Sequence, residues 1–364
     1  MRVVVSAGGT GGHIYPAVSI INKIREKEPN SEFLYIGTTD RMEKDLIPQL
    51  GINYQGIEIS GLKRKLTIKN FDTINKFLKA RKTCKKLIKD FNPDIVIGTG
   101  GYVTAPVVWA SHKLGIKTFI HEQNSVVGLS NKYLTRYVDK VGVSFESTMK
   151  EFPKDKVILT GNPCGESAIS MEKANKMDYQ LTPSKKLVLI VMGSLGSKTI
   201  NEKIVSFIDN FKEKDYEVMF ITGKTYYEEV KNIKLPSNVK IAPFINGMPS
   251  LMKAADLIIT RAGASTMSEI IALELPAIFV PSPFVTNNHQ YKNANDLATK
   301  NAGIILEEQH FNWENLNKQI NYVLLNKEKY QEIKNNLKKL AVTDSSERIY
   351  NILKEMITHD KKHI

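Results

Sequence analysis

Hydrophobic residues in this chain form short β-branched runs that alternate with longer amphipathic segments. The first run, "RVVVSA", is followed by a segment in which Ile14, Ala17, Val18, Ile21 and Ile24 recur at helical spacing. Short apolar runs of this kind are typical of strands buried on both faces of a parallel sheet. We expect strands at residues 3–6, 32–36, 94–97, 117–120, 140–144, 157–160, 187–192, 217–222, 239–242, 257–260, 277–280 and 303–306.

The alternation of strand and helix occurs twice, which predicts an α/β fold with two Rossmann-like domains. Each series begins with a strand that runs into a glycine-rich turn, "VVVSAGGTGGH" in the first and "VLIVMGSLGSK" in the second. Strand patterning lapses after "TGNP", so we place the domains at residues 1–163 and 164–344. A terminal helix at residues 345–362 has no strand after it, and we expect it to pack back on the first domain.

The two cysteines, Cys84 and Cys164, stand alone, which argues against a disulfide framework or a zinc site and fits a reducing cytosol. The apolar run at the N-terminus is too short for a signal peptide. No apolar run approaches the roughly 20 residues that a membrane-spanning helix needs. We therefore expect a cytoplasmic protein without a transmembrane helix.

The net charge of +13 is concentrated in one segment, because residues 61–91 carry +9 of it. Apolar residues recur there at helical spacing between the lysines, which is typical of helices on anionic membrane surfaces. A core helix with a solvated lysine face has the same pattern. Nucleic acid is another ligand for a basic patch, but no nucleic-acid motif is present. The expected membrane patch comprises Lys63, Arg64, Lys65, Ile68, Lys69, Phe71, Ile74 and Leu78.

Both glycine-rich turns stand between a strand and a helix, where free backbone N–H groups suit a phosphate. A tight turn that only packs a helix on its sheet has the same sequence. The dinucleotide pattern GxGxxG fails after Gly9 and Gly11, because Ile14 stands where the third glycine belongs. The P-loop pattern also fails, because no Gly-Lys-Ser or Gly-Lys-Thr follows either turn. The first turn can instead leave room for a bulky substrate.

Polar residues follow other predicted strands, at the edge where open α/β sheets bind ligands. In the first domain "FIHEQNS" carries Glu122 and Asn124. In the second domain, "RAGASTMSE" carries Glu269 one turn into a helix. Glu269 either caps that helix or accepts hydrogen bonds from two ribose hydroxyls. That helix begins with Ala264, Ser265 and Thr266. His13, after the first glycine turn, is either a structural histidine or a general base at neutral pH.

Six segments together resemble one family. "GGTGGHIYPA", "GTGGYVTAP", "HEQNSVVGLSNK", "TGNP", "RAGASTMSEI" and "NHQYKNA" follow in the order and spacing of the MurG family, the bacterial N-acetylglucosaminyltransferases of peptidoglycan synthesis. The resemblance implies a GT-B fold, two Rossmann-like domains with a cleft between them. It also implies inverting transfer of GlcNAc from UDP-GlcNAc to the muramyl C4 hydroxyl of undecaprenyl-pyrophosphoryl MurNAc-pentapeptide, lipid I, which gives lipid II.

The resemblance also assigns residues to the donor. Ser194 is similar to the serine at the diphosphate, Ile245 lines the uracil site, and Glu269 binds the ribose. The sugar contacts are Thr10, Gly11, Gly12, Asn124 and Gln290, or His289 in place of Gln290. The family usually has an arginine just after "GNP", where this chain has Cys164, Gly165 and Glu166. Either Lys198 or the helix N-terminus would then serve the phosphates.

The chemistry predicts a metal-independent transferase. A departing UDP needs donors aimed at its charge, and no Asp-x-Asp pair stands at a plausible strand end. UDP-GlcNAc is a substrate, so no cofactor is expected, and His13 is the first choice of base with Glu122 the second. The resemblance places the enzyme at the cytoplasmic membrane face, with other cell-wall synthesis proteins as partners. A UDP-GlcNAc epimerase and a non-catalytic nucleotide-sugar module are the alternatives.

Overall fold

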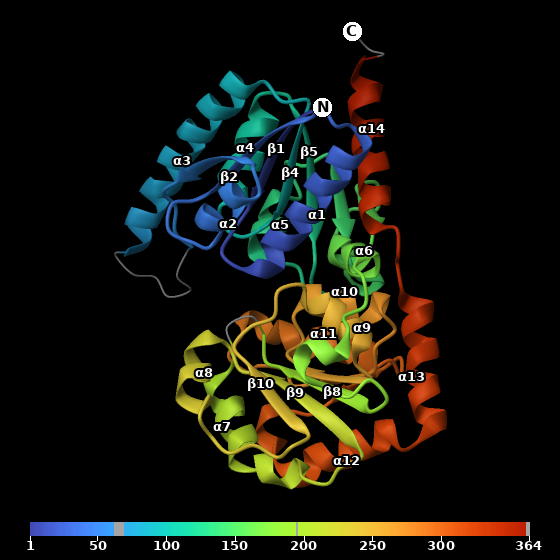
Figure 1. The fold of residues 1–364 in the computed structure, drawn as a ribbon. Helices are drawn as coiled ribbons and strands as arrows, with labels where there is room; N and C mark the ends of the chain where they lie inside the picture. The colour runs from blue at the N-terminus through green and yellow to red at the C-terminus, as the bar shows by residue number, and fades with distance from the viewer. Residues whose placement is uncertain (62–68, 194–195, 362–364) are drawn as a thin grey trace. The chain divides into compact units, whose positions relative to one another are not determined.

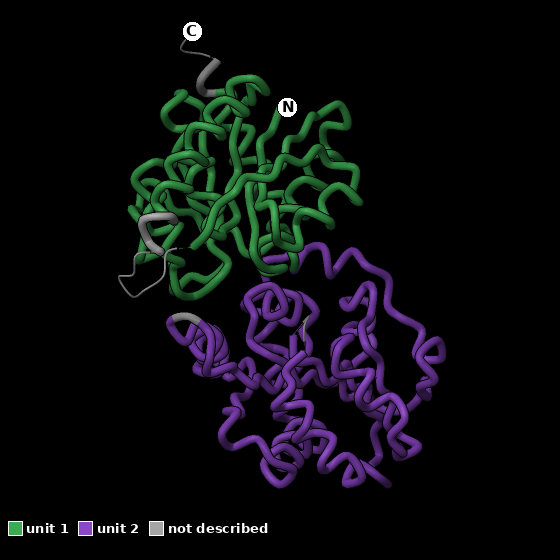
Figure 2. The backbone as a smooth tube through the Cα atoms, turned by 90° about the vertical axis from the view of Figure 1, so that its left-hand side faces the viewer, with its two compact units in different colours: residues 1–164, 344–364 green, residues 165–343 purple. Residues whose placement is uncertain are grey.

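The computed structural model describes residues 1–61, 69–193 and 196–361. Contacts divide the chain into two compact units (Figure 2). Unit 1 comprises residues 1–164 and 344–364, and unit 2 comprises residues 165–343. The chain therefore passes from unit 1 into unit 2 once, after Cys164, and returns at Asp344 for its last helix.

Unit 1 is built on a seven-stranded sheet in the order β3-β2-β1-β4-β5-β6-β7. Every pairing in it is parallel. The strands are β1 (Arg2–Ala7), β2 (Glu32–Thr38), β3 (Asn53–Ile57), β4 (Ile95–Gly100), β5 (Lys117–Glu122), β6 (Lys140–Val143) and β7 (Val157–Leu159). All their carboxyl ends consequently meet at one edge of the sheet.

Helices cover both faces of this sheet because its central strands are apolar on both sides (Figure 1). Val3 and Val5 of β1 pack with one helical layer, whereas Val4 packs with the other. The first layer holds α1 (Gly11–Lys27), α2 (Glu43–Gln49) and α14 (Ser345–Lys361); the second holds α3 (Lys69–Phe91) and α4 (Thr104–Lys113). Unit 1 also contains α5 (Leu129–Leu134), whereas α6 (Pro163–Ser170) begins at the end of unit 1 and continues into unit 2.

Unit 2 repeats the design with a six-stranded parallel sheet in the order β10-β9-β8-β11-β12-β13. The strands are β8 (Lys186–Val191), β9 (Tyr216–Ile221), β10 (Val239–Ala242), β11 (Leu257–Thr260), β12 (Ala277–Phe279) and β13 (Ile304–Ile305). The helices are α7 (Lys198–Ser206), α8 (Lys224–Val230), α9 (Met248–Ala254), α10 (Ala264–Ala272), α11 (His289–Ala298), α12 (Trp313–Leu324) and α13 (Lys327–Leu340).

The predicted fold class, two Rossmann-like α/β domains, is confirmed. One strand was not predicted, β3 at the edge of the unit 1 sheet. Most of its residues are at least partly exposed, so "NYQGI" lacks the continuous apolar run on which the prediction rested. A strand at the edge of a sheet pairs on one side only and needs less apolar surface.

The last helix, α14, is held on unit 1 by apolar packing and by ion pairs, including one with the Glu28 carboxylate. Ile349 and Leu353 are buried in the same core as α1. The Glu28 carboxylate, just after α1, accepts hydrogen bonds from Lys354 Nζ at 2.6 Å and from the Tyr350 hydroxyl and the N-terminal amino group at 3.0 Å. Burial opposes ionisation of Glu28, but these donors outweigh it and lower its pKa to about 2.

We expect Glu28→Gln to lower the free energy of unfolding at neutral pH by about 1 kcal/mol, the size of a solvent-screened ion pair. Because the folded pKa lies below the ordinary value, this contribution is complete above pH 4.5 and is lost as the pH falls towards 2. Urea unfolding, followed by the fluorescence of Trp109 in a Trp313→Phe background, measures it. An equal difference between variant and wild type at about pH 3 and about pH 7 would contradict this account.

Candidate active site

Two glycine turns of unit 1 touch backbone to backbone at the carboxyl ends of β1 and β4. The Gly8 N–H donates to the Gly100 carbonyl at 3.3 Å. Gly101 has φ +87°, and a Cβ there would lie 2.4 Å from the Gly8 carbonyl oxygen. Any side chain at position 101 would therefore separate the two turns, which explains the glycines of "GTGG" as a packing requirement.

His13 lies in the first turn of α1, against this pair of turns. Its Nδ1 is 3.1 Å from the Gly8 carbonyl oxygen. A carbonyl oxygen can only accept, so Nδ1 carries the proton and Nε2 of the neutral ring holds the lone pair. The Thr99 hydroxyl donates to the His13 carbonyl at 2.7 Å, and a Cβ at Gly100 would lie 2.6 Å from the His13 ring. The imidazole is thus oriented with Nε2 suited to accept a proton.

Three of the predicted sugar contacts of unit 1 stand near His13 in the chain. Thr10 is the N-cap of α1, and its carbonyl accepts the His13 backbone N–H at 3.1 Å. Gly11 and Gly12 are the first residues of the helix. The structure therefore brings Thr10, Gly11, Gly12 and His13 together at the carboxyl end of β1.

Glu122 ends β5 and organises the loop that follows it. Its carboxylate accepts hydrogen bonds from the backbone N–H groups of Asn124 and Gly128, at 3.0 and 2.9 Å, and from Asn131 Nδ2 at 2.9 Å. The Asn124 side-chain amide also donates to it at 3.2 Å. The side chain of Glu122 is 2% exposed. Glu122 thereby fixes the position of Asn124.

His121 and Gln123, on either side of Glu122, link neighbouring strands. His121 Nε2 is 2.8 Å from the Gly161 carbonyl oxygen, and its Nδ1 is 3.1 Å from Gln123 Nε2. Burial lowers the pKa of His121 to about 4, so the ring is neutral at pH 7. Gln123 also donates to the Thr99 carbonyl at 2.8 Å. The polar segment at residues 121–124 therefore contains structural residues as well as candidate ligands.

The glycine-rich turn of unit 2 follows β8. Ser194 lies outside the described residues. Gly193 and Gly196 have φ +82° and +75°, and the Gly196 N–H donates to the Gly193 carbonyl at 3.1 Å. A Cβ at Gly196 would lie 2.5 Å from the Thr222 carbonyl oxygen, so this turn also requires glycine to approach its neighbour. Ser197 is the N-cap of α7.

Arg261 is a residue of this region that the sequence analysis did not single out. It follows β11 and is buried. Its guanidinium donates to Ser197 Oγ at 2.7 Å, to the Val280 carbonyl at 2.9 Å and to Glu308 Oε2 at 2.7 Å. It thus fastens the start of α7 to two other strand ends. The sequence does indicate a site role for Arg261, because Arg261 opens the "RAGAS" segment directly after a predicted strand.

Glu269 lies in the second turn of α10, whose first residue, Ala264, is buried. Ser265 and Thr266 are partly exposed in the first turn. The described part of the chain offers no hydrogen-bond partner to the Glu269 carboxylate. Burial raises its pKa to about 8, as expected for a carboxyl group that has lost water without gaining a donor.

Two other predicted donor contacts lie on neighbouring segments of unit 2. Gln290, in the first turn of α11, accepts the Ser282 backbone N–H through Oε1 at 2.9 Å. His289 is the first residue of that helix, after two residues with positive φ, Asn287 and Asn288. Ile245 is nearly buried between β10 and α9.

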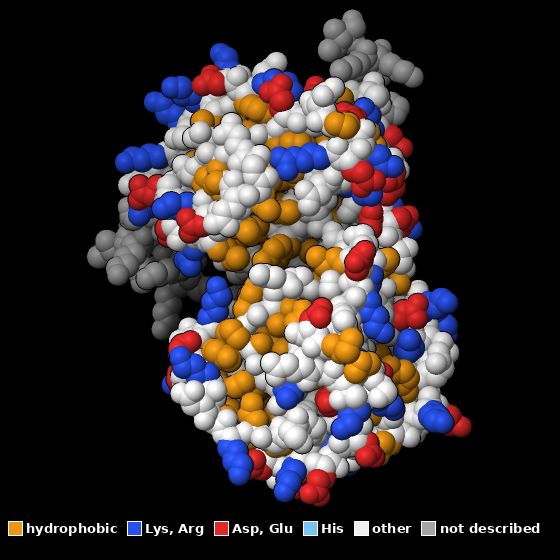
Figure 3. Space-filling model, viewed as in Figure 1, with side chains coloured by type: hydrophobic (Ala, Val, Ile, Leu, Met, Phe, Trp, Pro, Cys, Tyr) orange, Lys and Arg blue, Asp and Glu red, His pale blue; other side chains and the backbone are white. Residues whose placement is uncertain are grey.

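The membrane patch predicted on α3 is described in part. Lys63, Arg64, Lys65 and Ile68 lie outside the described residues, and only the backbone is described at Lys69 and Phe71. Ile74 and Leu78 are 48% and 51% exposed, so they are not core residues. Thr73, Ala80, Cys84 and Ile88 are buried on the opposite side of the helix. Lys and Arg side chains line the α3 edge of unit 1 (Figure 3).

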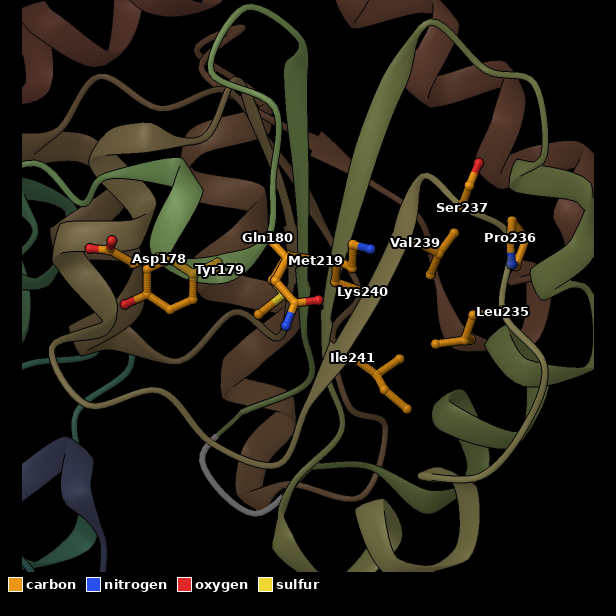
Figure 4. Close-up of a pocket in the computed structure, with 10 residues that line it drawn as sticks. All are labelled: Asp178, Tyr179, Gln180, Met219, Leu235, Pro236, Ser237, Val239, Lys240 and Ile241. Atoms are coloured by element: carbon orange, nitrogen blue, oxygen red, sulfur yellow. The ribbon is translucent and has the colours of Figure 1, made fainter.

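A surface pocket of about 460 Å³ lies beside β10 in unit 2 (Figure 4). It contains none of the predicted residues. Its lining includes Leu235, Pro236 and Val239, at the amino end of the edge strand, whereas ligands of such sheets bind at carboxyl ends. We therefore place the site at the glycine turns and not in this pocket.

Among the described residues, no cluster of three or more His, Cys, Asp or Glu side chains could hold a metal ion. No helix in the described ranges is long and apolar enough to cross a membrane.

Comparison with known proteins gives consistent matches. The glycosyltransferase family 28 N-terminal domain matches residues 3–143, and its C-terminal domain matches residues 187–349. A Bacillus licheniformis UDP-N-acetylglucosamine–N-acetylmuramyl-(pentapeptide) pyrophosphoryl-undecaprenol N-acetylglucosamine transferase is 45% identical over 99% of this chain and 100% of its own. The enzyme of the same name from Bacillus cytotoxicus is 45% identical over 98% of this chain and 100% of its own.

Solved structures agree with the sequence relatives. MurG of Acinetobacter baumannii superposes with a TM-score of 0.78 at 29% identity and covers 97% of this chain and 99% of its own. Staphylococcus aureus MnaA with UDP superposes with a TM-score of 0.70 at 15% identity, over 98% and 97% of the two chains. At 15% identity, the similarity to MnaA concerns the fold alone.

Proposed function

The chain belongs to the MurG family of glycosyltransferase family 28, and from this premise we propose that it transfers N-acetylglucosamine from UDP-GlcNAc to lipid I. The product is lipid II, the disaccharide-pentapeptide precursor of peptidoglycan, so the enzyme serves cell-wall growth and with it cell shape and division. The single observation that carries this function is the 45% identity, over nearly the whole chain, to transferases of that name.

We assign the general base to His13. Nδ1 is held by the Gly8 carbonyl, so Nε2 can take the proton of the muramyl C4 hydroxyl. The hydroxyl oxygen then bonds to C1 of GlcNAc while the bond from C1 to the phosphate oxygen breaks. UDP leaves with the electron pair, and attack from the opposite side inverts the configuration at C1.

Glu122, the second choice of base, is better suited to another role. Its carboxylate accepts four hydrogen bonds from its own loop, as described above. Proton abstraction would disrupt those bonds. We therefore propose that Glu122 holds Asn124 in position for the donor sugar.

Unit 2 would bind the nucleotide. Glu269 accepts the two ribose hydroxyls, Ile245 lines the uracil site, and Gln290 contacts the sugar, with Ala264, Ser265 and Thr266 at the N-terminus of α10 beside them. Ser282 already uses the side-chain oxygen of Gln290, which leaves its amide nitrogen as the group for the ligand. These assignments follow the family pattern position by position.

The diphosphate is served by the turn after β8, with Ser194 as hydroxyl donor. Cys164, in the place of the family arginine, is buried, and a Cβ at Gly165 would lie 2.9 Å from the Ser268 carbonyl oxygen, so this segment is used for packing. Lys198 is exposed, with acidic side chains 3.9 Å away. We propose that backbone N–H groups at the start of α7, positioned by Arg261 through Ser197, stabilise the departing charge without a metal ion.

We expect transfer of labelled GlcNAc from UDP-GlcNAc to lipid I in the presence of EDTA. His13→Ala should lower kcat at least about tenfold while UDP-GlcNAc binding is retained, because the base acts on the acceptor and not on the nucleotide. His112→Ala, which changes an exposed histidine of α4 in the same unit, is the matched control and should leave kcat unchanged.

The outcomes separate the alternatives. Transfer that requires magnesium would overturn the metal-free assignment alone. Unchanged kcat in His13→Ala would remove His13 as the base. Conversion of UDP-GlcNAc without any lipid acceptor would point to the epimerase, and binding without turnover under either condition would point to a non-catalytic module.

A second expectation concerns pH. Ribose hydroxyls donate to the ionised form of Glu269, whose pKa burial raises to about 8. The dissociation constant of UDP should therefore fall about tenfold as the pH rises from about 7 to about 9. Glu269→Gln should bind more weakly and lose this pH dependence. Isothermal titration of both proteins measures it, and a flat wild-type profile would argue against a ribose carboxylate with a raised pKa.

We further propose that α3 rests on an anionic membrane at its cytoplasmic face, because the acceptor is anchored there by its lipid. Exposed Ile74 and Leu78 are one turn apart, and Lys79, Lys82, Lys85, Lys86 and Lys89 are exposed along the same helix. Apolar insertion combined with basic charge is the usual basis of such binding.

Ile74→Ser and Leu78→Ser should each weaken binding to phosphatidylglycerol vesicles about fivefold, with phosphatidylcholine vesicles bound poorly by all variants. Leu325→Ser is the matched control, since Leu325 of unit 2 is 69% exposed. Vesicle co-sedimentation measures the affinities. Equal binding by all three variants and the wild type would rule out insertion of this helix face.

A further inference from the structure

The described part of unit 1 buries a carboxylate that the proposed mechanism does not use. Glu43, the first residue of α2, is 0% exposed. Its Oε1 accepts hydrogen bonds from the Thr38 hydroxyl at 2.7 Å and from the Thr38 backbone N–H at 3.2 Å. Its Oε2 accepts the Gly9 backbone N–H at 3.2 Å. The carboxylate thus joins the end of β2 to the glycine-rich turn after β1.

The bond to Gly9 leads directly to the proposed base. The Gly9 N–H and the Gly8 carbonyl belong to the same peptide group. Its N–H donates to Glu43, while its carbonyl accepts from His13 Nδ1 at 3.1 Å. One peptide group therefore stands between a carboxylate and an imidazole, with a hydrogen bond to each. Hydrogen bonds in such a chain polarise and strengthen one another.

The surrounding backbone leaves room for this carboxylate. A Cβ at Gly8 would lie 2.4 Å from Glu43 Oε1, and a Cβ at Gly37 would lie 2.8 Å from Glu43 Cγ. Either side chain would displace Glu43 from the turn. From the neighbouring strand β3, the Tyr54 hydroxyl donates to the carbonyl of Thr38, the residue whose hydroxyl and backbone N–H bind Glu43. Two of the glycines around the site are thus explained by Glu43.

We propose that Glu43 is a positioning residue for His13, acting through the peptide group that joins Gly8 to Gly9. The proposal rests on His13 as the base. The carboxylate holds the peptide so that its carbonyl faces Nδ1, which fixes the tautomer and the ring orientation. Its negative charge also favours the positively charged imidazolium that forms when Nε2 takes the acceptor proton. A carboxylate bonded directly to a catalytic histidine does the same in hydrolase triads.

Other titratable groups near Glu43 do not compete for this role. Tyr35 of β2 and Tyr54 of β3 both have a raised pKa, chiefly from burial, and stay neutral through the range of the test. Arg41, on the loop before α2, has a raised pKa, first through its hydrogen bond to Tyr102, and stays charged. Glu122, at the end of β5, is engaged by its own loop.

The test is the pH dependence of kcat in Glu43→Gln. An amide cannot accept at both positions, so either Thr38 or Gly9 loses an acceptor, and the charge is lost in both cases. We expect kcat to fall about tenfold at pH 7 with KM for UDP-GlcNAc unchanged. The acidic limb of the kcat profile should move to lower pH by about half a unit or more, because loss of the negative charge disfavours the imidazolium.

Two further variants distinguish positioning from stability. Glu43→Asp keeps the charge, so its acidic limb should stay at the wild-type pH even if kcat falls. Tyr54→Phe removes the hydrogen bond to the Thr38 carbonyl but keeps every hydrogen bond to Glu43. The melting temperature should therefore fall, while the acidic limb of the kcat profile stays at the wild-type pH. The far-UV circular dichroism spectrum and the melting transition of each variant show that it is folded.

The experiments distinguish a failure of the positioning role of Glu43 from a failure of His13 as the base. If the acidic limb of the kcat profile lies at the same pH in Glu43→Gln as in the wild type, the inference is overturned and His13 remains the base. If His13→Ala retains full kcat, the base assignment fails first, and the inference fails with it. A fall in kcat that matches Tyr54→Phe at every pH would also overturn it, because it would report stability alone.

Discussion

The unit 1 site depends on the close approach of two backbone turns, those that follow β1 and β4. The Gly8 N–H reaches the Gly100 carbonyl only because Gly101 carries no side chain. With the turns in contact, the Gly8 carbonyl faces His13, and the Gly9 N–H on the opposite side of the same peptide group faces Glu43. A side chain at any of these glycines would separate groups that have to act together.

Unit 2 meets the same requirement with different groups. Its turn also uses glycine at positive φ to approach a neighbouring strand end, where Gly196 lies against the Thr222 carbonyl. The turn is fastened by a charged side chain, since Arg261 connects Ser197 with Glu308. Pairing that guanidinium with a carboxylate offsets part of the cost of burying both charges. Ser197, at the start of α7, is thereby fixed by contacts within unit 2.

Several polar residues at the sheet edge organise the loops that follow the strands. Glu122 and Glu43 each accept backbone N–H groups from loops, and His121 spans two strand ends as a neutral ring. Burial decides these roles, because a buried acceptor must be satisfied by nearby donors. His13 is half-buried, and its Nδ1 is bonded to the Gly8 carbonyl, which is the basis for proposing it as the base.

The sequence by itself determined the two-domain α/β fold, because apolar runs at strand length and helical periodicity depend only on local order along the chain. It also pointed to His13, Glu269 and the glycine turns, since these follow strand ends in the linear order. It did not predict β3, whose edge position lets it remain polar, nor single out Arg261 or Glu43. Their roles come from contacts such as Glu43 with Gly9, far apart in the chain, which form only when the strands are placed side by side. Tertiary structure alone decided that Glu122 supports a loop and that Ile74 and Leu78 stay exposed, because both depend on what packs against each side chain.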